Sequence, residues 1–501
     1  MITKVHLEAT TAILSQPRSE RRKARATMSE TDSNQSQRRS LDPDAETMRR
    51  LGYELVDRVV AHLDTLSDQR VARRGTGAEF ARLVDEPLPE EAAGIQTSLD
   101  FFFRRVVPDM TRVNHPRFHA YIPCPSSFAG AVGEMLAAGT NPFVGSWLGG
   151  ATLSALEVTV LRWICEMLGY PPDAAGILTS GGSMANLIAL ASARAEHDAD
   201  LLRNGIIYTS TEGHASVHKA ALLLGFPDNA LRTIRVDDRL RMKATELSQA
   251  IARDRAAGKR PFVVVANGGT TNTGAIDPLA EIAEVCQRSK LWFHVDAAYG
   301  GFAAITPTGR QMLAGMERAD SLTLDPHKWL YCPMGIGCIL VRRQASLKRA
   351  FATAGHYLKD IPVEEVNFFE RGPELSRPAR VLAVWMVIRS SGRDALAHQI
   401  TEDIRLAQLA ADLLRECDRF DVIEPELSVV AFRHRRRADE PEANRAARDS
   451  ALIEATLADG ELMLSSTLLG GMSALRLVVM NHRTTEADIH RSVARIRQLA
   501  T

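Results

Sequence analysis

Short apolar runs alternate with amphipathic stretches through the middle of this 501-residue chain, between about residues 128 and 395. Each run has the length of a buried strand, and the stretches between the runs carry apolar residues at three- and four-residue steps. Strands that alternate with helices form a mainly parallel sheet covered by helices, so the pattern predicts an α/β fold. The apolar runs occupy residues 176–179, 206–209, 262–266, 291–295, 321–324 and 335–341.

One helix start is explicit in this region. Asp277 is expected to cap a helix in which Pro278 takes the first turn and Leu279 begins the buried stripe. Elsewhere the helix boundaries are less sharply marked.

The two flanks of this region follow other patterns. From Asp42 onward apolar residues recur at helical spacing from Met48 to Leu63, which predicts an amphipathic helix within a segment of residues 42–127. A segment this short has too little chain for a core of its own and usually packs on a neighbour. After about residue 396 a smaller α+β domain is expected to run to residue 501, interrupted at residues 433–449 by a charged stretch that is typical of an exposed loop.

Residues 1–41 are different in kind. They are rich in Ser, Thr, Gln and Arg and lack periodic apolar positions, which predicts a disordered basic tail. The tail resembles an organellar transit peptide in composition, or it is an upstream extension with Met28 as the start. It lacks the apolar core of a secretory signal.

Composition fits a large enzyme with a small substrate. Lys+Arg and Asp+Glu are equal at 61 each, so no net charge favours nucleic acid or an acidic membrane. The six cysteines show no metal-binding or disulfide spacing, which indicates free thiols in a reducing compartment, and we expect a cytoplasmic protein. The longest uncharged apolar stretches, such as residues 220–226, are too short to cross a bilayer.

The strongest chemical signal is a lysine and an aspartate that follow two of the apolar runs. Lys328 stands beside His327 after the run at 321–324, and Asp296 ends the run at 291–295. A lysine that forms a Schiff base, with an aspartate to pair with a pyridinium nitrogen, is the pair that pyridoxal phosphate requires. The lysine must lose its proton before it can attack the cofactor, either by desolvation or through a neighbouring positive charge that His327 could supply. Alone, Lys328 could be a surface lysine and Asp296 a strand-end cap.

Two further motifs fit the same cofactor. Residues 176–186 read as a strand, a glycine turn and a helix start, where Gly182 lets the backbone approach a phosphate and Ser183 offers a hydroxyl. Many αβ connections use glycine only to turn, so this motif gains its meaning from Lys328. His214 follows the run at 206–209 and could stack on the pyridine ring. With His218 it could also lie on a surface helix or form half a metal site, but no third ligand at zinc spacing follows, and no metal is predicted.

From these residues the chain resembles the group II pyridoxal phosphate-dependent amino acid decarboxylases, which include aromatic L-amino acid, histidine, glutamate and diaminobutyrate decarboxylases. The resemblance runs from about Asp42 to the C-terminus. It rests on motifs in the family order at residues 114–121, 181–183, 214, 270–271, 294–299 and 326–329.

The resemblance implies a fold type I enzyme. It has a mainly parallel seven-stranded sheet in a large domain (128–395), an N-terminal helical dimerisation segment (42–127) and a small C-terminal domain (396–501). It also implies a homodimer with active sites at the interface.

The same resemblance implies a role for each motif residue. Lys328 forms the internal aldimine, Asp296 pairs with the pyridinium, His214 stacks on one face of the ring and Ala298 packs on the other. Lys328, Asp296 and His214 are thus the predicted catalytic residues. The phosphate is expected near Gly182, Ser183, Asp325 and His327, and the ring's phenolic oxygen near Thr271.

The predicted reaction is decarboxylation of an L-amino acid to the amine and CO2 through a quinonoid intermediate. By resemblance five residues line the substrate side and mildly favour an aromatic or apolar substrate, although they could equally be core or dimer packing: Phe118, Tyr121, Pro123, Phe143 and Trp147. An aminotransferase or another pyridoxal phosphate lyase is a weaker alternative, because no late arginine can be assigned as a substrate clamp. A non-catalytic relative is disfavoured because every cofactor motif is intact.

One position departs from the family pattern. Many members carry a tyrosine on a mobile loop that is thought to protonate the quinonoid carbon, and an ungapped count back from Trp385 puts Phe368 there. The only tyrosine between Phe351 and Trp385 is Tyr357, which matches a different family position unless the alignment contains a gap. If Phe368 takes the tyrosine's place, His214 or water must supply the proton, and dioxygen could compete to give aldehyde, ammonia and peroxide. A decarboxylation-dependent aldehyde synthase is therefore the main alternative.

Overall fold

The computed structural model describes residues 41–352 and 364–500, which form two compact units. The predicted basic tail lies outside the described residues except for its last residue, and so does Tyr357. The first unit contains α3 (Ala45–Asp64) up to His62, and residues 91–99 with most of α5 (Ile95–Phe101). The amide of Gln96 joins the two helices: Arg50 donates to its oxygen at 3.1 Å, and its nitrogen donates to Glu54 at 2.7 Å. The predicted amphipathic helix from Asp42 is confirmed.

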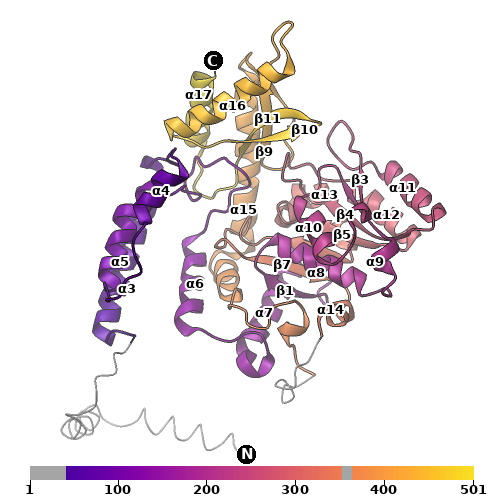
Figure 1. The fold of residues 1–501 in the computed structure, drawn as a ribbon, viewed down its shortest axis with the longest axis horizontal. Coiled ribbons are helices and arrows are strands. Elements are labelled where there is room, and N and C mark those ends of the chain that lie inside the picture. The colour runs from indigo at the N-terminus through magenta and orange to yellow at the C-terminus, as the bar shows by residue number, and fades with distance from the viewer. Residues whose placement is uncertain (1–40, 353–363, 501) are drawn as a thin grey trace, which may run out of the picture. The chain divides into compact units, whose positions relative to one another are not determined.

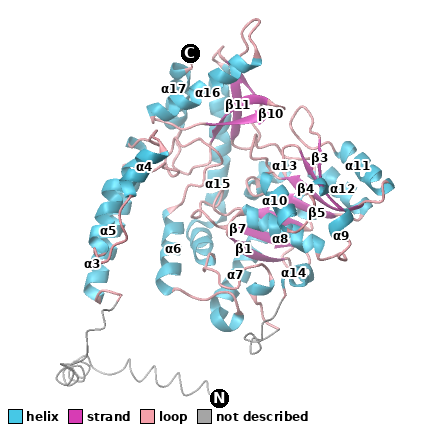
Figure 2. Ribbon diagram, viewed as in Figure 1, coloured by secondary structure: helices cyan, strands magenta, loops and turns pink. Residues whose placement is uncertain are grey.

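The second unit, residues 63–90 and 100–501, is built on a seven-stranded sheet in the order β1-β7-β6-β5-β4-β2-β3 (Figures 1 and 2). Only β7 runs antiparallel to its neighbours, so the predicted mainly parallel sheet is confirmed. The strands are β1 (Ala175–Thr179), β2 (Gly205–Ser210), β3 (Leu231–Ile234), β4 (Arg260–Asn267), β5 (Trp292–Asp296), β6 (Ser321–Leu324) and β7 (Gly337–Val341). Six of the seven strands match the apolar runs of the sequence. The sequence did not predict β3, because this strand is short and half of its residues are polar.

Helices join and cover these strands. α8 lies across the sheet with α10 and α14 beside it, while α7 packs on β1 and α11 and α12 pack on β4 (Figure 2). The helices of this part are α4 (Gly77–Val84), α6 (Phe128–Thr140), α7 (Trp147–Leu168), α8 (Gly182–Arg194), α9 (Leu201–Asn204), α10 (Ala215–Leu223), α11 (Ala244–Ala256), α12 (Leu279–Ser289), α13 (Pro307–Met312) and α14 (Gln344–Phe351).

One of these helices, α7, is long and apolar enough to span a membrane by length and composition alone. It was not singled out from the sequence, because only uncharged apolar stretches such as residues 220–226 were considered there. Its inner face packs into the core of the second unit through Val160, Leu161 and Ile164. It also buries Glu157, which pairs with Arg377 at 2.7 Å. These contacts are those of a core helix in a folded domain.

A long helix, α15 (Val381–Arg415), links the large sheet to a smaller α+β domain. It is kinked at Gly392, whose φ of 76° is easily adopted only by glycine. The second half packs on a four-stranded antiparallel sheet in the order β10-β11-β9-β8. The remaining elements are β8 (Phe420–Val422), β9 (Val429–His434), α16 (Glu442–Asp459), β10 (Ser465–Leu469), β11 (Met472–Val478) and α17 (Glu486–Leu499).

Two local predictions were wrong. Asp277 does not cap α12, which begins at Leu279 with no side-chain cap. Its buried carboxylate instead accepts hydrogen bonds from the backbone N–H groups of Met242 and Asn267, both at 2.7 Å. Burial raises the pKa of Asp277 to about 6. The charged stretch 433–449 is also not one loop, because its second part forms the start of α16, whose Arg445 and Asp449 are buried.

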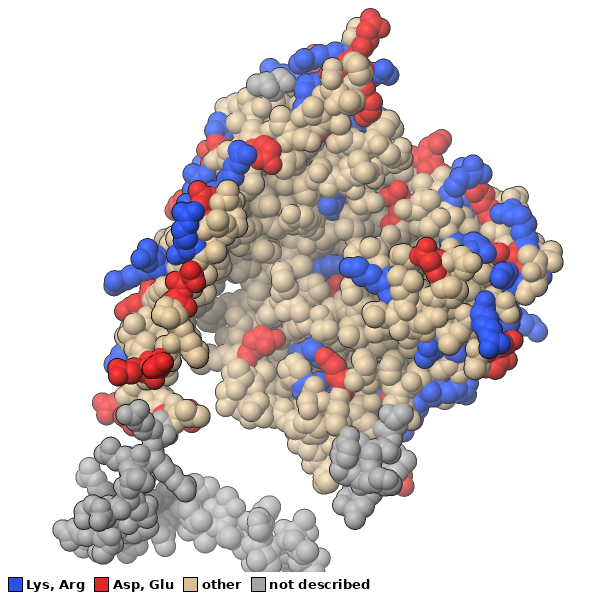
Figure 3. Space-filling view, in the orientation of Figure 1, with Lys and Arg blue, Asp and Glu red and all other residues tan. Residues whose placement is uncertain are grey.

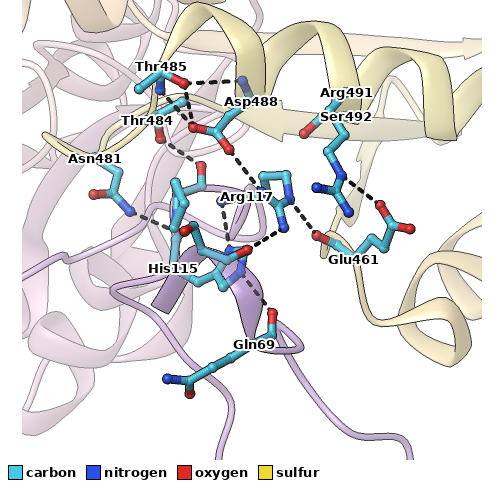
Figure 4. A network of polar contacts seen from close by, with 12 residues as sticks. Gln69, His115, Arg117, Glu461, Asn481, Thr484, Thr485, Asp488, Arg491 and Ser492 are labelled. Carbon is cyan, nitrogen blue, oxygen red and sulfur yellow. Dashed lines mark hydrogen bonds and ion pairs between the residues drawn. The ribbon is translucent and has the colours of Figure 1, made fainter. Parts of the chain in front are cut away.

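Residues 114–119 belong structurally to the small domain. Phe118 pairs with Met463 in a backbone bridge, and Asn481 donates to the carbonyls of Asn114 and His115 (Figure 4). The Arg117 guanidinium, 5% exposed, pairs with Asp488 on α17 at 2.9 Å. These contacts attach the segment before the large domain to the last helix of the chain.

Acidic and basic side chains are mixed on the surface of the second unit. On the face in Figure 3 both kinds lie side by side over the region of α9, α11 and α12. This mixture agrees with the balanced composition and with a small substrate rather than a polyanion.

Candidate active site

The predicted chemical residues meet where the parallel strands end. In the sheet register Asn267 of β4 lies beside Asp296 of β5, which lies beside Thr323 of β6. The carboxyl ends of parallel strands and the loops that follow them are the usual place for a ligand in such sheets. A cavity is found there, lined by Ser180, Gly181, Gly182, Ser183, Asn186, His214, Ser216, Asn267, Gly269, Thr270, Thr271, Asp296, Ala298, Tyr299, Asp325, His327 and Lys328.

All nine residues that the sequence predicted around the cofactor line this cavity, although they come from five separate segments of the chain. They are Gly182, Ser183, His214, Thr271, Asp296, Ala298, Asp325, His327 and Lys328. The structure thus brings the predicted residues together, while their individual roles stay predictions.

The start of α8 forms a tight glycine cradle. Gly181 has a φ of 130°, and a Cβ on Gly182 would lie 2.9 Å from the Asp325 carboxylate and 3.1 Å from the Cβ of Ala298. Gly337 packs directly against this turn, because a Cβ on Gly337 would lie 2.5 Å from the Gly181 backbone. Gly181, Gly182 and Ser183 at the start of α8 line the cavity, and free backbone N–H groups at a helix start suit an anion.

Lys328 is held by a carboxylate. Its Nζ lies 3.0 Å from Oδ2 of Asp325, while the other oxygen of Asp325 is buried with no hydrogen-bond partner. Desolvation lowers the pKa of Lys328, but the charge and hydrogen bond of Asp325 outweigh it together with the charges of Cys124 and Asp296, so that the pKa is raised above its ordinary value. Desolvation acts on Lys328 in the expected direction, but it does not by itself lower the pKa below the ordinary value.

His327 supplies no positive charge to Lys328. Burial lowers the pKa of His327, so its imidazole is neutral near pH 7. Its Nδ1 lies 2.7 Å from the carbonyl oxygen of Ile336 and must donate its proton there. The predicted activation of Lys328 by His327 is therefore wrong, whereas the position of His327 beside the cradle is as expected.

Asn186 on α8 orients Asp296, and sequence reasoning missed this role. Its side-chain nitrogen donates to Oδ2 of Asp296 at 2.7 Å, and the N–H of Ala298 donates to Oδ1 at 3.2 Å. The side-chain oxygen of Asn186 accepts from Thr323 at 2.7 Å and from His294 at 3.0 Å. Because both ends of the amide are engaged, its orientation is fixed and Asp296 receives a donor. Helical spacing from Gly182 to Asn186 was the only signal in the sequence.

The proton of neutral His214 is placed on Nε2 by its neighbours. His214 is the N-cap of α10, and its Nδ1 accepts from the backbone N–H of Ser216 at 3.2 Å. A backbone N–H can only donate, so Nδ1 carries the lone pair. The Ser216 hydroxyl, which accepts from Asn186 at 2.8 Å, also lies 2.7 Å from Nδ1. Ser216 was likewise missed in the sequence.

The five predicted substrate-side residues do not line the cavity of this chain. Phe118 is buried in a small apolar cluster with Val71, Ala120, Val113 and Met463, which agrees with the packing alternative. Pro123 is buried, Trp147 begins α7, and Phe143 is 39% exposed. Their contact with substrate stays a prediction.

Tyr121 is a partial exception because Arg476 holds it next to the cavity. The Arg476 guanidinium donates to the carbonyls of Tyr121 and Thr271, and Thr271 lines the cavity. Tyr121 has a φ of 59°, and its side chain is 62% exposed. Burial lowers the pKa of Arg476 to about 10, and among the described residues its guanidinium donates to carbonyl and hydroxyl oxygens. Arg476 is a late arginine that could not be assigned from the sequence.

Phe368 is not on a loop that faces the cavity. It lies in a short 3-10 helix, is 0% exposed, and its ring is covered by the guanidinium of Arg377 at 4.8 Å and that of Arg371 at 5.4 Å. The buried ring of Phe368 does not face the cavity, and residues 353–363, which contain Tyr357, lie outside the described residues. That Phe368 takes the place of a proton-donating tyrosine, with oxidative side turnover as the consequence, stays a prediction.

Pyridoxal phosphate fits the residues present. The glycine cradle has no room for a Cβ but offers N–H groups for a phosphate, and Ser183 adds a hydroxyl. Lys328 supplies an amine, and Asp296 supplies a carboxylate with fixed orientation. No cluster of three or more His, Cys, Asp or Glu side chains that could hold a metal occurs in the described part of the chain.

Comparison with known proteins gives the same picture. Residues 78–435 match the family model described as the pyridoxal-dependent decarboxylase conserved domain. The chain is 37% identical over 467 residues to an aromatic-L-amino-acid decarboxylase of Bacillus atrophaeus, covering 92% of this chain and 97% of that protein. It is 30% identical over 462 residues to a phenylacetaldehyde synthase of Arabidopsis thaliana, covering 89% and 94%.

Comparison with solved structures also points to pyridoxal phosphate-dependent decarboxylases. The crystal structure of Oryza sativa TDC with PLP and tryptamine superposes with a TM-score of 0.87 at 28% identity, covering 92% of this chain and 99% of that chain. The cavity and these likenesses place the chain in the pyridoxal-dependent decarboxylase family, whose members are pyridoxal phosphate-dependent amino acid decarboxylases.

Proposed function

We propose that this decarboxylase acts on an aromatic L-amino acid and releases the amine and CO2. The observation that carries the proposal is Tyr121, an exposed aromatic side chain on a backbone in the left-handed region, tied by Arg476 to Thr271 of the cavity. An aromatic residue whose backbone is held beside the cavity suits an aromatic substrate. The aromatic activity of the Bacillus atrophaeus relative supports the same choice.

The residues divide the work as follows. Bound pyridoxal phosphate supplies the electron sink that lets CO2 leave. Lys328 would hold the cofactor covalently through Nζ, and the glycine cradle would hold its phosphate. Asp296, oriented by donors from Asn186 and Ala298, would accept the proton of the ring nitrogen. His214 presents Nε2–H as a hydrogen-bond donor.

A substrate screen tests the aromatic assignment. Purified chain with added pyridoxal phosphate is incubated with each standard L-amino acid and with L-2,4-diaminobutyrate, and CO2, amine, aldehyde and peroxide are measured. We expect kcat/KM for the best aromatic substrate to exceed that for glutamate or diaminobutyrate at least tenfold. Tyr121→Ala should raise KM for that substrate more than it lowers kcat, whereas Leu223→Ala, at an exposed position of α10, should leave both unchanged.

Three outcomes of the screen are decisive. CO2 from glutamate or diaminobutyrate alone would overturn the aromatic assignment and leave decarboxylation intact. Aldehyde and peroxide in place of amine would establish the aldehyde synthase alternative. Equal amounts of amine and CO2 in air are the expected result.

We also propose that the protein is a cytoplasmic homodimer whose active sites need both subunits. The observation in favour is α3, which exposes large apolar side chains that include Leu55, Val56 and Val60. Exposed apolar surface of this kind usually marks an interface.

Sedimentation tests the dimer. The double change Val56→Glu and Val60→Glu should give monomers that also lose pyridoxal phosphate, because association and cofactor binding are linked. Arg49→Glu on the same helix changes the net charge equally and should remain dimeric. Fully active monomers whose sedimentation does not depend on concentration would refute the proposal.

A further inference from the structure

Asp403 is a buried carboxylate that the catalytic residues described above do not explain. It lies on the second half of α15 and is 0% exposed. Among the described residues no lysine or arginine forms an ion pair with it. Burial raises its pKa to about 7. An acidic group buried without a cation is costly, so its presence in a core calls for a reason other than stability.

The partners of Asp403 are donors from the segment that carries the catalytic lysine. Oδ2 accepts from the indole Nε1 of Trp329 at 3.0 Å and from the hydroxyl of Tyr331 at 2.8 Å. Oδ1 accepts from Gln399, one turn earlier on α15, at 3.2 Å. Trp329 follows Lys328 directly in the chain, and Tyr331 comes two residues later.

The backbone of this segment is a strained turn. Tyr331 has a φ of 51°, a left-handed conformation that is unfavourable for any residue with a Cβ atom. The turn is closed by the N–H of Lys328 to the carbonyl of Asp325 at 2.9 Å and by the N–H of Tyr331 to the carbonyl of Lys328 at 3.0 Å. Strain at such a site persists only where the surroundings hold it. The two bonds to Asp403 hold both side chains that follow the lysine.

A second link connects Asp403 to the cavity. The Trp329 ring stacks on Tyr299 with ring centroids 4.9 Å apart, and Tyr299 lines the cavity. The Tyr299 hydroxyl is fixed in turn by Ser428 at 2.8 Å. A shift of Trp329 would therefore move the cavity wall as well as the lysine backbone.

We propose that Asp403 is a positioning residue, which holds Trp329 and Tyr331 so that the Lys328 side chain leaves the turn toward the cofactor. It acts on the lysine through the turn and touches neither cofactor nor substrate. The inference rests on Lys328 as the cofactor lysine and is independent of which amino acid is decarboxylated.

Asparagine and leucine separate positioning from charge. Asp403→Asn keeps an oxygen for Trp329 and Tyr331, and Gln399 can turn its amide to face the new NH2. Asp403→Leu keeps the approximate volume and removes both acceptors. Asp412→Leu, nine residues later on α15 with an exposed side chain, is the matched control.

Three quantities are measured for each variant: the dissociation constant of pyridoxal phosphate with cofactor-free protein, the fraction of cofactor fixed to the Lys328 peptide by borohydride, and the urea unfolding of cofactor-free protein. Asp403→Leu should bind the cofactor at least tenfold more weakly and fix a smaller fraction of what is bound. Asp403→Asn should stay within threefold of the original protein in both, and Asp412→Leu should be unchanged.

Tyr331→Phe keeps the test decisive if Asp403→Leu does not fold. It removes one hydroxyl, and the fraction fixed at saturating cofactor should fall at least threefold. A folded Asp403→Leu or Tyr331→Phe protein that binds and fixes the cofactor normally would overturn the proposal, even if its unfolding midpoint were lower. Substrate turnover is not a readout, so failure of the aromatic assignment would leave this result interpretable.

Discussion

Lys328→Ala is expected to give a folded protein that makes no amine and in which borohydride fixes no pyridoxal phosphate. The lysine amine is the only group in the cavity lining that can hold the cofactor covalently. Its side chain contacts Asp325 and is not part of the apolar core, so its loss should leave the sheet intact. The measurements are amine release, mass of the borohydride-treated protein and far-ultraviolet circular dichroism.

Lys219→Ala is the control for this change. Lys219 is exposed on α10, and it takes part in no ion pair within residues 41–352 and 364–500. It should bind cofactor and release amine at the original rate. Normal turnover by Lys328→Ala would remove the assignment of the cofactor lysine.

Asp296→Asn should retain the cofactor but slow decarboxylation by about 10² to 10⁴-fold. Asparagine fits the same space, yet it lacks the charge that keeps a proton on the ring nitrogen. The side-chain nitrogen of Asn186 donates to the Asp296 carboxylate. In Asp296→Asn the new amide can turn either its oxygen or its NH2 group toward Asn186, and the NH2 group would place two donors against each other. Single-turnover rates with saturating pyridoxal phosphate separate the chemical step from cofactor loss.

Asp320→Asn is the matched control for Asp296→Asn. Asp320 precedes β6 at the opposite end of the sheet, where its carboxylate accepts from the N–H of Phe293 at 2.9 Å. The control should lower stability without changing the rate of the chemical step. A rate within tenfold of the original for Asp296→Asn would show that Asp296 is not needed for electron withdrawal.

The large sheet and the cofactor cavity could be predicted because they depend on local patterns. Six of its strands are apolar runs, and each predicted cofactor residue follows the end of a strand or begins a helix. Parallel strands carry their carboxyl ends to one edge, so residues distant in the chain meet there without any knowledge of side-chain contacts. Strand β3 was not predicted, because only Ile234 of its four residues is buried and the strand shows no apolar run.

The roles of single side chains could not be predicted, because they depend on contacts across the chain. Asn186 and Arg476 act through hydrogen bonds to residues 30 to 355 positions away, and Ser216 joins its neighbour His214 to this network through Asn186. Asp277 was predicted to cap a helix because capping can be read from neighbouring residues. Its actual partners are Asn267 at the end of β4 and Met242 in a loop before α11. Phe368 was placed by counting residues, which cannot reveal that Arg371 and Arg377 enclose its ring.

The attachment of residues 114–119 to the small domain affects how the chain matures during translation. Arg117 bonds to Asp488, which is made 371 residues later, and the N–H of His119 bonds to Met463. At synthesis rates of about 5–20 residues per second, this segment waits about 20–70 s for its partners. Its apolar Phe118 and buried imidazoles are exposed to proteases and chaperones during that time. The large sheet can assemble before the ribosome finishes, but the first part of the chain reaches its native state only at the end of synthesis.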